Sequence, residues 1–212
     1  MSKELAIVGD IHSNVNLLNK LVKERPYIQN IIQVGDMGIY FSPEKVDKKS
    51  IYTEKILKEK PEMDRTTYFI KGSHEHFNML KNPFLKKKNF YYIEQGKIET
   101  INNLKIAFLG GIYSPTKSNE KKFYTEQEVN KLKNNSRGQI IDILITHEGP
   151  KGLVKKPNSD EGSHIILDLL QTIRPKYHIH GHHHWNYKTR YRSTKVIGLG
   201  NFNKNNQSFK LI

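Results

Sequence analysis

The stretch LAIVGDIH at residues 5–12 decides the fold, together with IIQVGD at residues 31–36. Each stretch starts with a run of apolar residues and then reaches a glycine followed by an aspartate. Between them, apolar residues recur at the spacing of an amphipathic helix, at positions 17, 18, 21 and 22. A strand, a helix and a second strand normally form a right-handed parallel crossover. We therefore expect Asp10 and Asp36 to lie at the same edge of one sheet.

The rest of the chain predicts both helices and strands. We expect three helices: one over residues 42–60, one that begins after a capping box formed by Thr125 and Glu128, and one from Ser163 to about residue 173. We expect strands at residues 67–70, 90–93, 97–101, 105–109, 140–145, 177–179, 187–192, 195–199 and 209–212, the second, third and fourth forming a meander. This mixture predicts two packed sheets with helices outside them, or one mixed α/β sheet, within a single domain over residues 1–212.

Composition restricts the partners and the ligands. The 212 residues include 35 Lys and Arg against 21 Asp and Glu, a formal net charge of +14, and such a field attracts polyanions. The basic residues are scattered, with Lys86-Lys87-Lys88 as the one tight run, so a lysine-rich solvated surface is the favoured interpretation. The chain has no cysteine, so a bound metal must be held by oxygen and imidazole nitrogen.

The first ten residues, MSKELAIVGD, have no long apolar stretch behind a basic start. We expect a strand there and no signal peptide. No apolar run approaches the roughly 20 residues that are needed to cross a bilayer. The sequence thus predicts a cytoplasmic protein without a membrane partner.

Five separate segments follow a predicted strand with a carboxylate or a histidine: Asp10 with His12, Asp36, His74, His147, and His182 with His184. On a strand-like backbone, residues two apart point to one side, so Asp10 and His12 can share a cation, as can His182 and His184. Asp36 has two oxygens and can bridge two cations. These ligands suit Mn, Fe, Zn, Ni or Co, and two ions about 3.5–4 Å apart can clamp a phosphoryl group and activate water.

The same segments, in order, resemble the signature of the calcineurin-like metallophosphoesterases. That signature reads D-x-H, G-D, G-N-H-[DE], a lone H, and G-H-x-H; here it is carried by residues 9–12, 35–36, 72–75, 146–147 and 181–184. The resemblance spans most of the chain. It implies an α/β fold, a four-layer αββα sandwich of two mixed β-sheets flanked by helices.

The resemblance also implies two divalent metal ions, with Mn favoured and Fe, Zn, Ni, Co or Mg as alternatives. Asp10, His12 and His184 would bind the first ion, Asp36 would bridge both, and His147 and His182 would bind the second. In the family a metal-bridging hydroxide attacks phosphorus. His74 would then be the general acid that protonates the leaving oxygen, and Glu75 would support the ligands from behind.

Ser73 departs from the family pattern, which usually has asparagine at this position. The asparagine amide ligates the second ion, whereas serine is shorter and a weaker neutral ligand. Ser73 therefore predicts a weaker or water-completed second site, or one that depends on a particular metal. It also favours the alternative of a binding or scaffold protein that has lost catalysis on the same fold.

Looser similarity links the chain to the RNA lariat debranching branch of the family. It rests on residues 77–80, 90–111, 123–125 and 142–150. That branch often has cysteine in place of Asp10, so the chain departs from it there. We predict hydrolysis of a phosphodiester in a nucleotide or nucleic acid. A phosphomonoester substrate and nucleic-acid binding without hydrolysis are the alternatives.

For several other residues, a structural role is favoured over a functional one. His76, His164 and His178 match no motif, and His183 alternates away from its neighbours. Packing is favoured over base stacking for five aromatic residues, namely Tyr40, Phe41, Tyr91, Tyr92 and Trp185. A solvated strand face is favoured over phosphate binding for Arg190 and Arg192.

Overall fold

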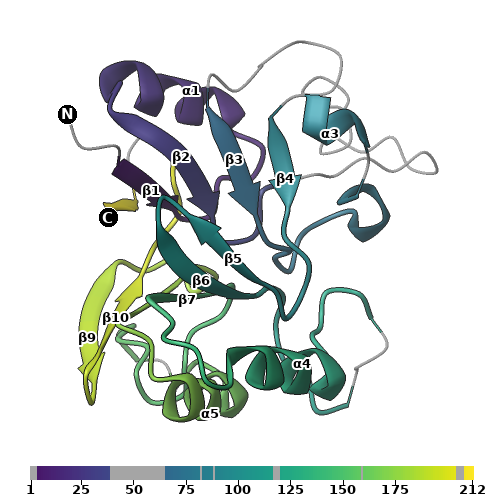
Figure 1. Cartoon of the computed structure of the whole chain (residues 1–212), viewed down its shortest axis with the longest axis vertical. Coiled ribbons are helices and arrows are strands. Elements are labelled where there is room, and N and C mark those ends of the chain that lie inside the picture. The colour runs from purple at the N-terminus through teal and green to yellow at the C-terminus, as the bar shows by residue number, and fades with distance from the viewer. Residues whose placement is uncertain are drawn as a thin grey trace.

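Two mixed β-sheets face each other in the computed structural model of this protein (Figure 1). The structure describes residues 4–38, 65–81, 83–87, 89–116, 120–158, 160–203 and 208–212. The first sheet has the order β11-β1-β2-β3-β4, with strands Phe209–Leu211, Glu4–Val8, Ile28–Gln33, Thr66–Phe69 and Phe90–Tyr92. The second has the order β5-β6-β7-β8-β10-β9, with strands Ile98–Ile101, Leu104–Leu109, Ile143–Thr146, Tyr177–His180, Thr194–Gly198 and Tyr187–Tyr191.

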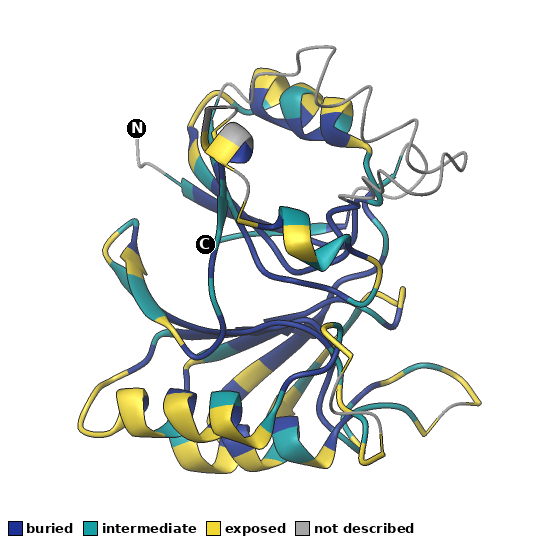
Figure 2. Ribbon diagram, turned by 90° about the vertical axis from the view of Figure 1, so that its right-hand side faces the viewer, coloured by how far each residue is buried: buried dark blue, intermediate teal, exposed yellow. Residues whose placement is uncertain are grey.

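Helices form the outer layers (Figure 2). Helix α1 (Val15–Glu24) covers the first sheet, and α4 (Glu126–Ser136) and α5 (His164–Ile173) cover the second. Short turns of helix occur at Phe77–Met79 and at α3 (Pro83–Lys87). The predicted four-layer sandwich is confirmed. The helix expected over residues 42–60 lies outside the described residues, as do Tyr40 and Phe41. Within the described part of the chain, no helix has the length and apolar run needed to span a membrane.

Three hydrophobic cores fill the spaces between the four layers. In β1, Leu5 and Ile7 point into the core between the sheets, whereas Ala6 and Val8 point toward α1, and all four are fully buried. This follows from the alternation of side chains along a strand. Burying each such Leu, Ile or Val side chain stabilises the fold by about 1.5–3 kcal/mol. A strand that is buried on both faces needs the continuous apolar runs seen in the sequence.

Parallel pairing brings strand ends together. Strands β1 to β4 run parallel to one another in one sheet, as do β6, β7, β8 and β10 in the other, whereas the edge strands β11, β5 and β9 are antiparallel. The register aligns Val8 with Gln33, and Thr146 with His180, so the segments after these strands leave at one edge. The loops from the two sheets meet there, since the ring of His147 lies against the carbonyl of Val34.

The predicted meander over residues 90–109 is wrong. Strand β4 pairs in parallel with β3 in the first sheet, whereas β5 and β6 form a hairpin in the second. The alternating pattern of residues 90–93 predicts a strand but does not predict which strand it pairs with. Phe90 is buried in the core between the first sheet and its helices. The hairpin turn is confirmed, with φ of 50° at Asn102 and 62° at Asn103. Strand β7 begins at Ile143 and not at Ile140 as expected, and Ile140 is 79% exposed.

Two expectations at helix starts are confirmed. The Thr125 side chain accepts a hydrogen bond from the Glu128 backbone N–H, and the Glu128 carboxylate accepts one from the Thr125 N–H. Ser163 caps α5 by accepting hydrogen bonds from the N–H groups of Ile165 and Ile166. These caps replace backbone partners that the first turn of a helix lacks.

Candidate metal centre

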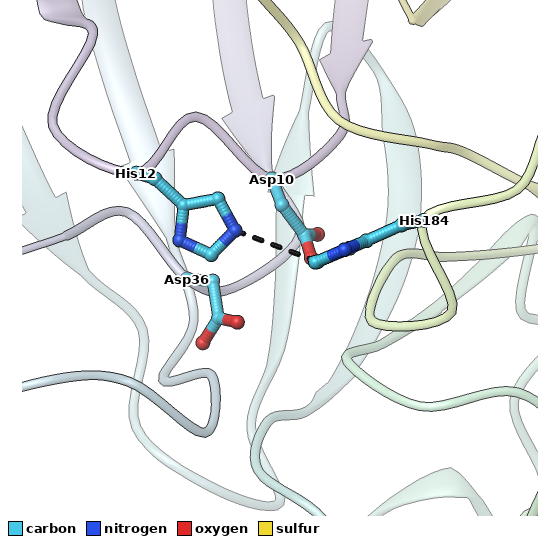
Figure 3. A group of neighbouring side chains, drawn as sticks. All are labelled: Asp10, His12, Asp36 and His184. Carbon is cyan, nitrogen blue, oxygen red and sulfur yellow. Dashed lines mark hydrogen bonds and ion pairs between the residues drawn. The ribbon is translucent and has the colours of Figure 1, made fainter.

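Two groups of ligand atoms share Asp36. In the first group, one ligand atom from each of Asp10, His12, Asp36 and His184 lies within 4.8 Å of all the others (Figure 3). In the second, the same holds for Asp36, His147 and His182. The structure thus brings together all six residues that the sequence predicted as ligands. The aspartates follow strands of the first sheet, and His147 and His182 follow strands of the second.

Four of the six candidate ligands have a left-handed backbone conformation, which sets the direction of their side chains. The φ angle is 42° at His12, 55° at Asp36, 66° at His182 and 53° at His184. The strand-like backbone that we expected here is therefore wrong, although Asp10 and His12 do fall into one group as predicted. Although His182 and His184 are two residues apart, they belong to different groups. Non-glycine residues in this region cost about 1–3 kcal/mol each, so the surrounding contacts must hold them there.

Asp36 is fixed by the segment that follows β3. Its Oδ1 accepts hydrogen bonds from the backbone N–H of Ser73 (2.6 Å) and of His74 (2.8 Å). Burial raises the pKa of Asp36, but the nearby His147 imidazole and the His74 N–H outweigh it, so the net pKa is lowered. The carboxylate is therefore negatively charged at neutral pH and is oriented before any ligand arrives.

His147 presents an unpaired ring nitrogen to Asp36. Its Nδ1 lies 2.9 Å from the carbonyl oxygen of Val34 and donates to it, so Nε2 is the ring nitrogen that is left to face Asp36. Nε2 is buried, has no hydrogen-bond partner among the described residues and lies 3.5 Å from Asp36 Oδ1. Burial, and then the neighbouring His147, lower the pKa of His182 to about 3, so the His182 ring is neutral at pH 7. Two imidazoles beside a buried carboxylate fit a cation.

The first group has similar chemistry at the surface. His184 Nε2 lies 3.2 Å from Asp10 Oδ2, and His12 Nε2 lies 3.4 Å from His184 Nε2. The hydrogen bond to Asp10 raises the pKa of His184, whereas burial lowers that of His12. Nitrogen and oxygen donors thus converge on one point, as a cation with imidazole and carboxylate ligands requires.

Two glycines let the backbone approach the carboxylates. A Cβ atom on Gly72 would lie 2.0 Å from Asp36 N and 2.1 Å from Asp36 Oδ1. A Cβ atom on Gly181 would lie 2.1 Å from Asp10 Oδ1. No side chain fits at either position. The close packing explains why glycine stands before Ser73 and before His182.

A model of the calcineurin-like phosphoesterases matches residues 4–186, most of the chain. The chain belongs to this family. The lariat debranching enzyme of Entamoeba histolytica is 31% identical over 167 residues, which cover 63% of this chain and 47% of that protein. The lariat debranching enzyme of Schizosaccharomyces pombe is 26% identical over 151 residues, which cover 56% and 33%. The chain therefore spans less than half the length of these relatives.

A solved structure shows the shared fold. The protein TT1561 of Thermus thermophilus superposes with a TM-score of 0.61 at 13% identity, covering 95% of this chain and 90% of that one. At this identity the likeness concerns the fold alone.

The family's third motif, residues 72–75, lies at the mouth of the centre. His74 is exposed, and its ring centroid lies 6.2 Å from that of His12. Ser73 Oγ lies 3.3 Å from Asp36 Oδ2, which places the hydroxyl against the shared carboxylate. Glu75 turns away and is buried, accepting hydrogen bonds from the N–H groups of Met37 (2.7 Å) and Gly38 (3.2 Å). Glu75 thereby holds the loop that follows Asp36.

Sequence reasoning missed several buried polar residues behind the phosphoesterase site. The Gln33 side chain forms two hydrogen bonds with the backbone of Gly35: it accepts one from the N–H at 3.0 Å and donates one to the carbonyl. Thr146 donates to the carbonyl of Glu148, so its hydroxyl accepts from His178 Nε2 at 2.7 Å. A polar residue inside an otherwise apolar strand is the signal that could have identified Gln33 and Thr146.

Glu148 was missed as well. Its carboxylate accepts hydrogen bonds from the Tyr124 hydroxyl and from the Tyr113 N–H at 3.0 Å. Burial raises the pKa of Glu148. The contacts connect the segment after His147 to the start of α4, across a long sequence separation that no local pattern reveals.

His180 and His183, which flank the ligand histidines, make structural contacts instead. His183 points away from the centre, contacting Glu161 and accepting from the Gly149 N–H at 2.9 Å. The ring of His180 lies against Tyr187, whose hydroxyl is 2.6 Å from Nε2. Arg192 does not lie on a strand, because β9 ends at Tyr191 and Arg192 has a φ of 51° in the following turn.

Proposed function

We propose that this phosphoesterase hydrolyses a phosphodiester in a nucleotide or nucleic acid, with two divalent cations of which Mn²⁺ is favoured. One observation carries the proposal: two groups of carboxylate and imidazole ligands share the single carboxylate of Asp36. A shared carboxylate is the arrangement that holds two cations close together. Paired cations serve phosphoryl transfer by clamping the attacking and leaving oxygens.

The donor set fits this assignment. Asp10, His12 and His184 would hold one ion, His147 and His182 the other, and Asp36 would contact both. When bound, such ions would neutralise charge on the phosphoryl group and lower the pKa of a water. Oxygen and imidazole donors without thiolate suit Mn²⁺, with Fe, Zn, Ni, Co or Mg as alternatives. The orphaned Nε2 of His147 supports a ligand there, since a buried nitrogen without a partner is costly.

His74 is the proposed general acid. Its backbone N–H is anchored on Asp36, which fixes the start of the side chain beside the shared carboxylate. Its ring is exposed at the mouth, where a leaving group would depart. The imidazole can therefore hold a proton and deliver it to the leaving oxygen. Glu75 supports this geometry by holding the loop after Asp36.

The preference for a diester in nucleic acid rests on two further observations. The named relatives are lariat debranching enzymes, which favours a nucleic-acid substrate. The net charge of +14 favours association with a polyanion. Phosphomonoester hydrolysis is the alternative activity of the same centre.

Ser73 supports a second candidate function, a binding or scaffold protein with little activity. The second ligand group has three members against four in the first, and Ser73 offers only a short hydroxyl beside it. Ser73→Asn separates the two candidates. A large gain in rate supports an enzyme with a weakened second site, whereas an unchanged low rate supports the scaffold.

Bis-p-nitrophenyl phosphate and p-nitrophenyl phosphate test the proposal when each is assayed with Mn, Mg, Zn, Ni, Co and Fe. We expect diester turnover with Mn²⁺, and loss of turnover and of bound Mn²⁺ in Asp36→Asn. Isothermal titration calorimetry gives the stoichiometry independently of activity. Asp168→Asn is the matched control, because Asp168 pairs with Lys133 on the outer helices. Absence of turnover with every metal, or equal Mn²⁺ binding by both variants, would refute the proposal.

A further inference from the structure

A groove lies where the edges of the two sheets diverge. One part, about 440 Å³, is lined by the end of β10, the start of β9 and the residues around β11. The adjoining part, about 490 Å³, is lined by Tyr177 and by the middle of the β9–β10 hairpin. Both parts share Lys188, Ile197 and Lys210, so they are continuous. The hairpin and the C-terminus lie on the same side of the molecule (Figure 1).

Cationic side chains repeat along the groove. The register pairs Lys188 with Ile197 and Arg190 with Lys195, so these residues share one face of the hairpin. Lys188 and Arg190 are two residues apart on a strand, a separation of about 7 Å. Lys195 Nζ lies 5.2 Å above the Tyr177 ring, and Lys210 faces the hairpin from the other sheet.

These charges are not neutralised by acidic neighbours. Among the described residues, Lys188, Arg190, Lys195 and Lys210 form no ion pair with a carboxylate. Several lysines elsewhere do, in the pairs Lys20–Glu24, Lys81–Glu94, Lys122–Glu120, Lys133–Asp168, Lys151–Asp160, Lys156–Glu161 and Lys176–Asp142. The four cationic side chains of the groove therefore keep a positive charge that no carboxylate of the described residues compensates.

The groove also connects to the metal centre along the chain. Asn186, at its near end, is two residues after His184. Trp185 lies between them and is 44% exposed, an aromatic surface on which a base can stack. A cationic track with an aromatic residue toward the reactive centre matches the pattern of single-strand binding, in which basic groups follow the backbone and rings stack on bases.

We infer that this groove binds the phosphate backbone of a single-stranded nucleic acid whose reactive diester lies in the metal centre. The inference rests on the proposed function, and it assigns Lys188, Arg190 and Lys195 to phosphate contacts outside that centre. An open groove between two edge strands, β9 and β11, suits a single extended strand better than a flat anionic membrane surface.

Fluorescence anisotropy with a labelled strand of about 16 nucleotides tests the inference, using RNA and DNA of one sequence in EDTA. The groove variant is Lys188→Gln, Arg190→Gln and Lys195→Gln together. Since each phosphate contact contributes about −0.7 to the slope of log K against log salt, we expect the slope to weaken by about 2. At about 0.1 M salt the affinity should fall about 100-fold for both strands.

The matched control removes the same charge from the outer helices, through Lys20→Gln, Lys23→Gln and Lys133→Gln. It should leave the slope unchanged. Equal weakening by the two triple variants would overturn the inference, because net charge alone would then explain binding. Unchanged nucleic-acid binding by the groove variant, together with new self-association in sedimentation, would also overturn the inference. The lysines would then serve to prevent edge strands from pairing. Thermal unfolding verifies that both variants fold.

Anionic phosphatidylserine vesicles provide the competing occupant. Vesicle binding that is lost in the groove variant while strand binding persists would overturn the assignment. Turnover of bis-p-nitrophenyl phosphate by the unsubstituted protein reports on the metal centre alone, since a small diester does not need the groove. Failure of the groove and failure of the proposed activity are thereby distinguished.

Discussion

Replacing Gly181 with alanine should disable the metal centre without changing any ligand. The added Cβ would lie 2.1 Å from Asp10 Oδ1, whereas ordinary contact begins near 3.4 Å, so one of them must move by about 1.3 Å. Metal sites tolerate departures of only about 0.2 Å in ligand distance. Misplacement by about 1 Å typically costs about 100-fold in rate. We therefore expect Gly181→Ala to lose at least this factor and to lose the ion held by Asp10, His12 and His184.

Elemental analysis of bound Mn, with diester turnover measured on the same sample, checks this prediction. The Mn content should fall from two ions toward one, because the second group does not include Asp10. Gly138→Ala is the control: its φ of 70° imposes a cost of about 1 kcal/mol, but a Cβ there meets nothing within 4 Å. Two retained ions and a rate within a few-fold of the unsubstituted protein would refute the steric argument.

Three further predictions concern residues outside the ligand set. Burial lowers the pKa of His178 to about 3 from 6.5, so the unfolded chain binds an extra proton between these values. The free energy of unfolding should thus fall as pH drops through this window, by up to roughly 5 kcal/mol, and His178→Leu should remove that part in urea titrations. Glu75→Gln should weaken Mn²⁺ binding 10–100-fold in calorimetry, because the loop after Asp36 loses its charged acceptor. Thr125→Ala should lower the free energy of unfolding by about 1 kcal/mol in urea titrations, because α4 loses its cap.

Each of these has a matched test. A pH profile of His178→Leu that superposes on that of the unsubstituted chain would contradict the burial argument. Glu126→Gln, an exposed change of the same kind on α4, should leave Mn²⁺ affinity unaltered. Thr125→Ser keeps the capping hydroxyl and should retain most of the stability that alanine loses.

The residue pattern predicted the meeting of the strand ends but left two packed sheets and one mixed sheet open, and the resemblance to the calcineurin-like family selected the sandwich. Continuous apolar runs followed by Gly-Asp or Thr-His predict buried parallel strands, and parallel strands end at one edge. The resemblance to the calcineurin-like family implied that His182 and His184 belong to different ligand groups, which is what the structure shows and which residue spacing alone got wrong. The reason is the left-handed backbone at both histidines, which a periodicity argument cannot anticipate.

Long-range contacts account for what could not be predicted. Strand β4 joins the first sheet because Phe90 fits into the core beneath that sheet's helices, a matter of three-dimensional packing. Glu75 was expected to support the ligands, but its partners, the backbone N–H groups of Met37 and Gly38, could not be predicted because they belong to a loop distant in sequence. The groove at the sheet edges arises from two strands that are distant in sequence, β9 and β11, so its charges appear scattered along the chain.

Because the candidate ligands come from both sheets, a bound cation would link the two halves of the molecule. Asp10 and Asp36 follow strands of one sheet, and His147 and His182 follow strands of the other. An ion that bridges them would resist separation of the halves and would favour the native state by mass action, by about 2.7 kcal/mol at 100 times its dissociation constant. Chelation would then lower the melting temperature as well as the activity, and a titration of melting temperature against Mn²⁺ would measure affinity without any substrate.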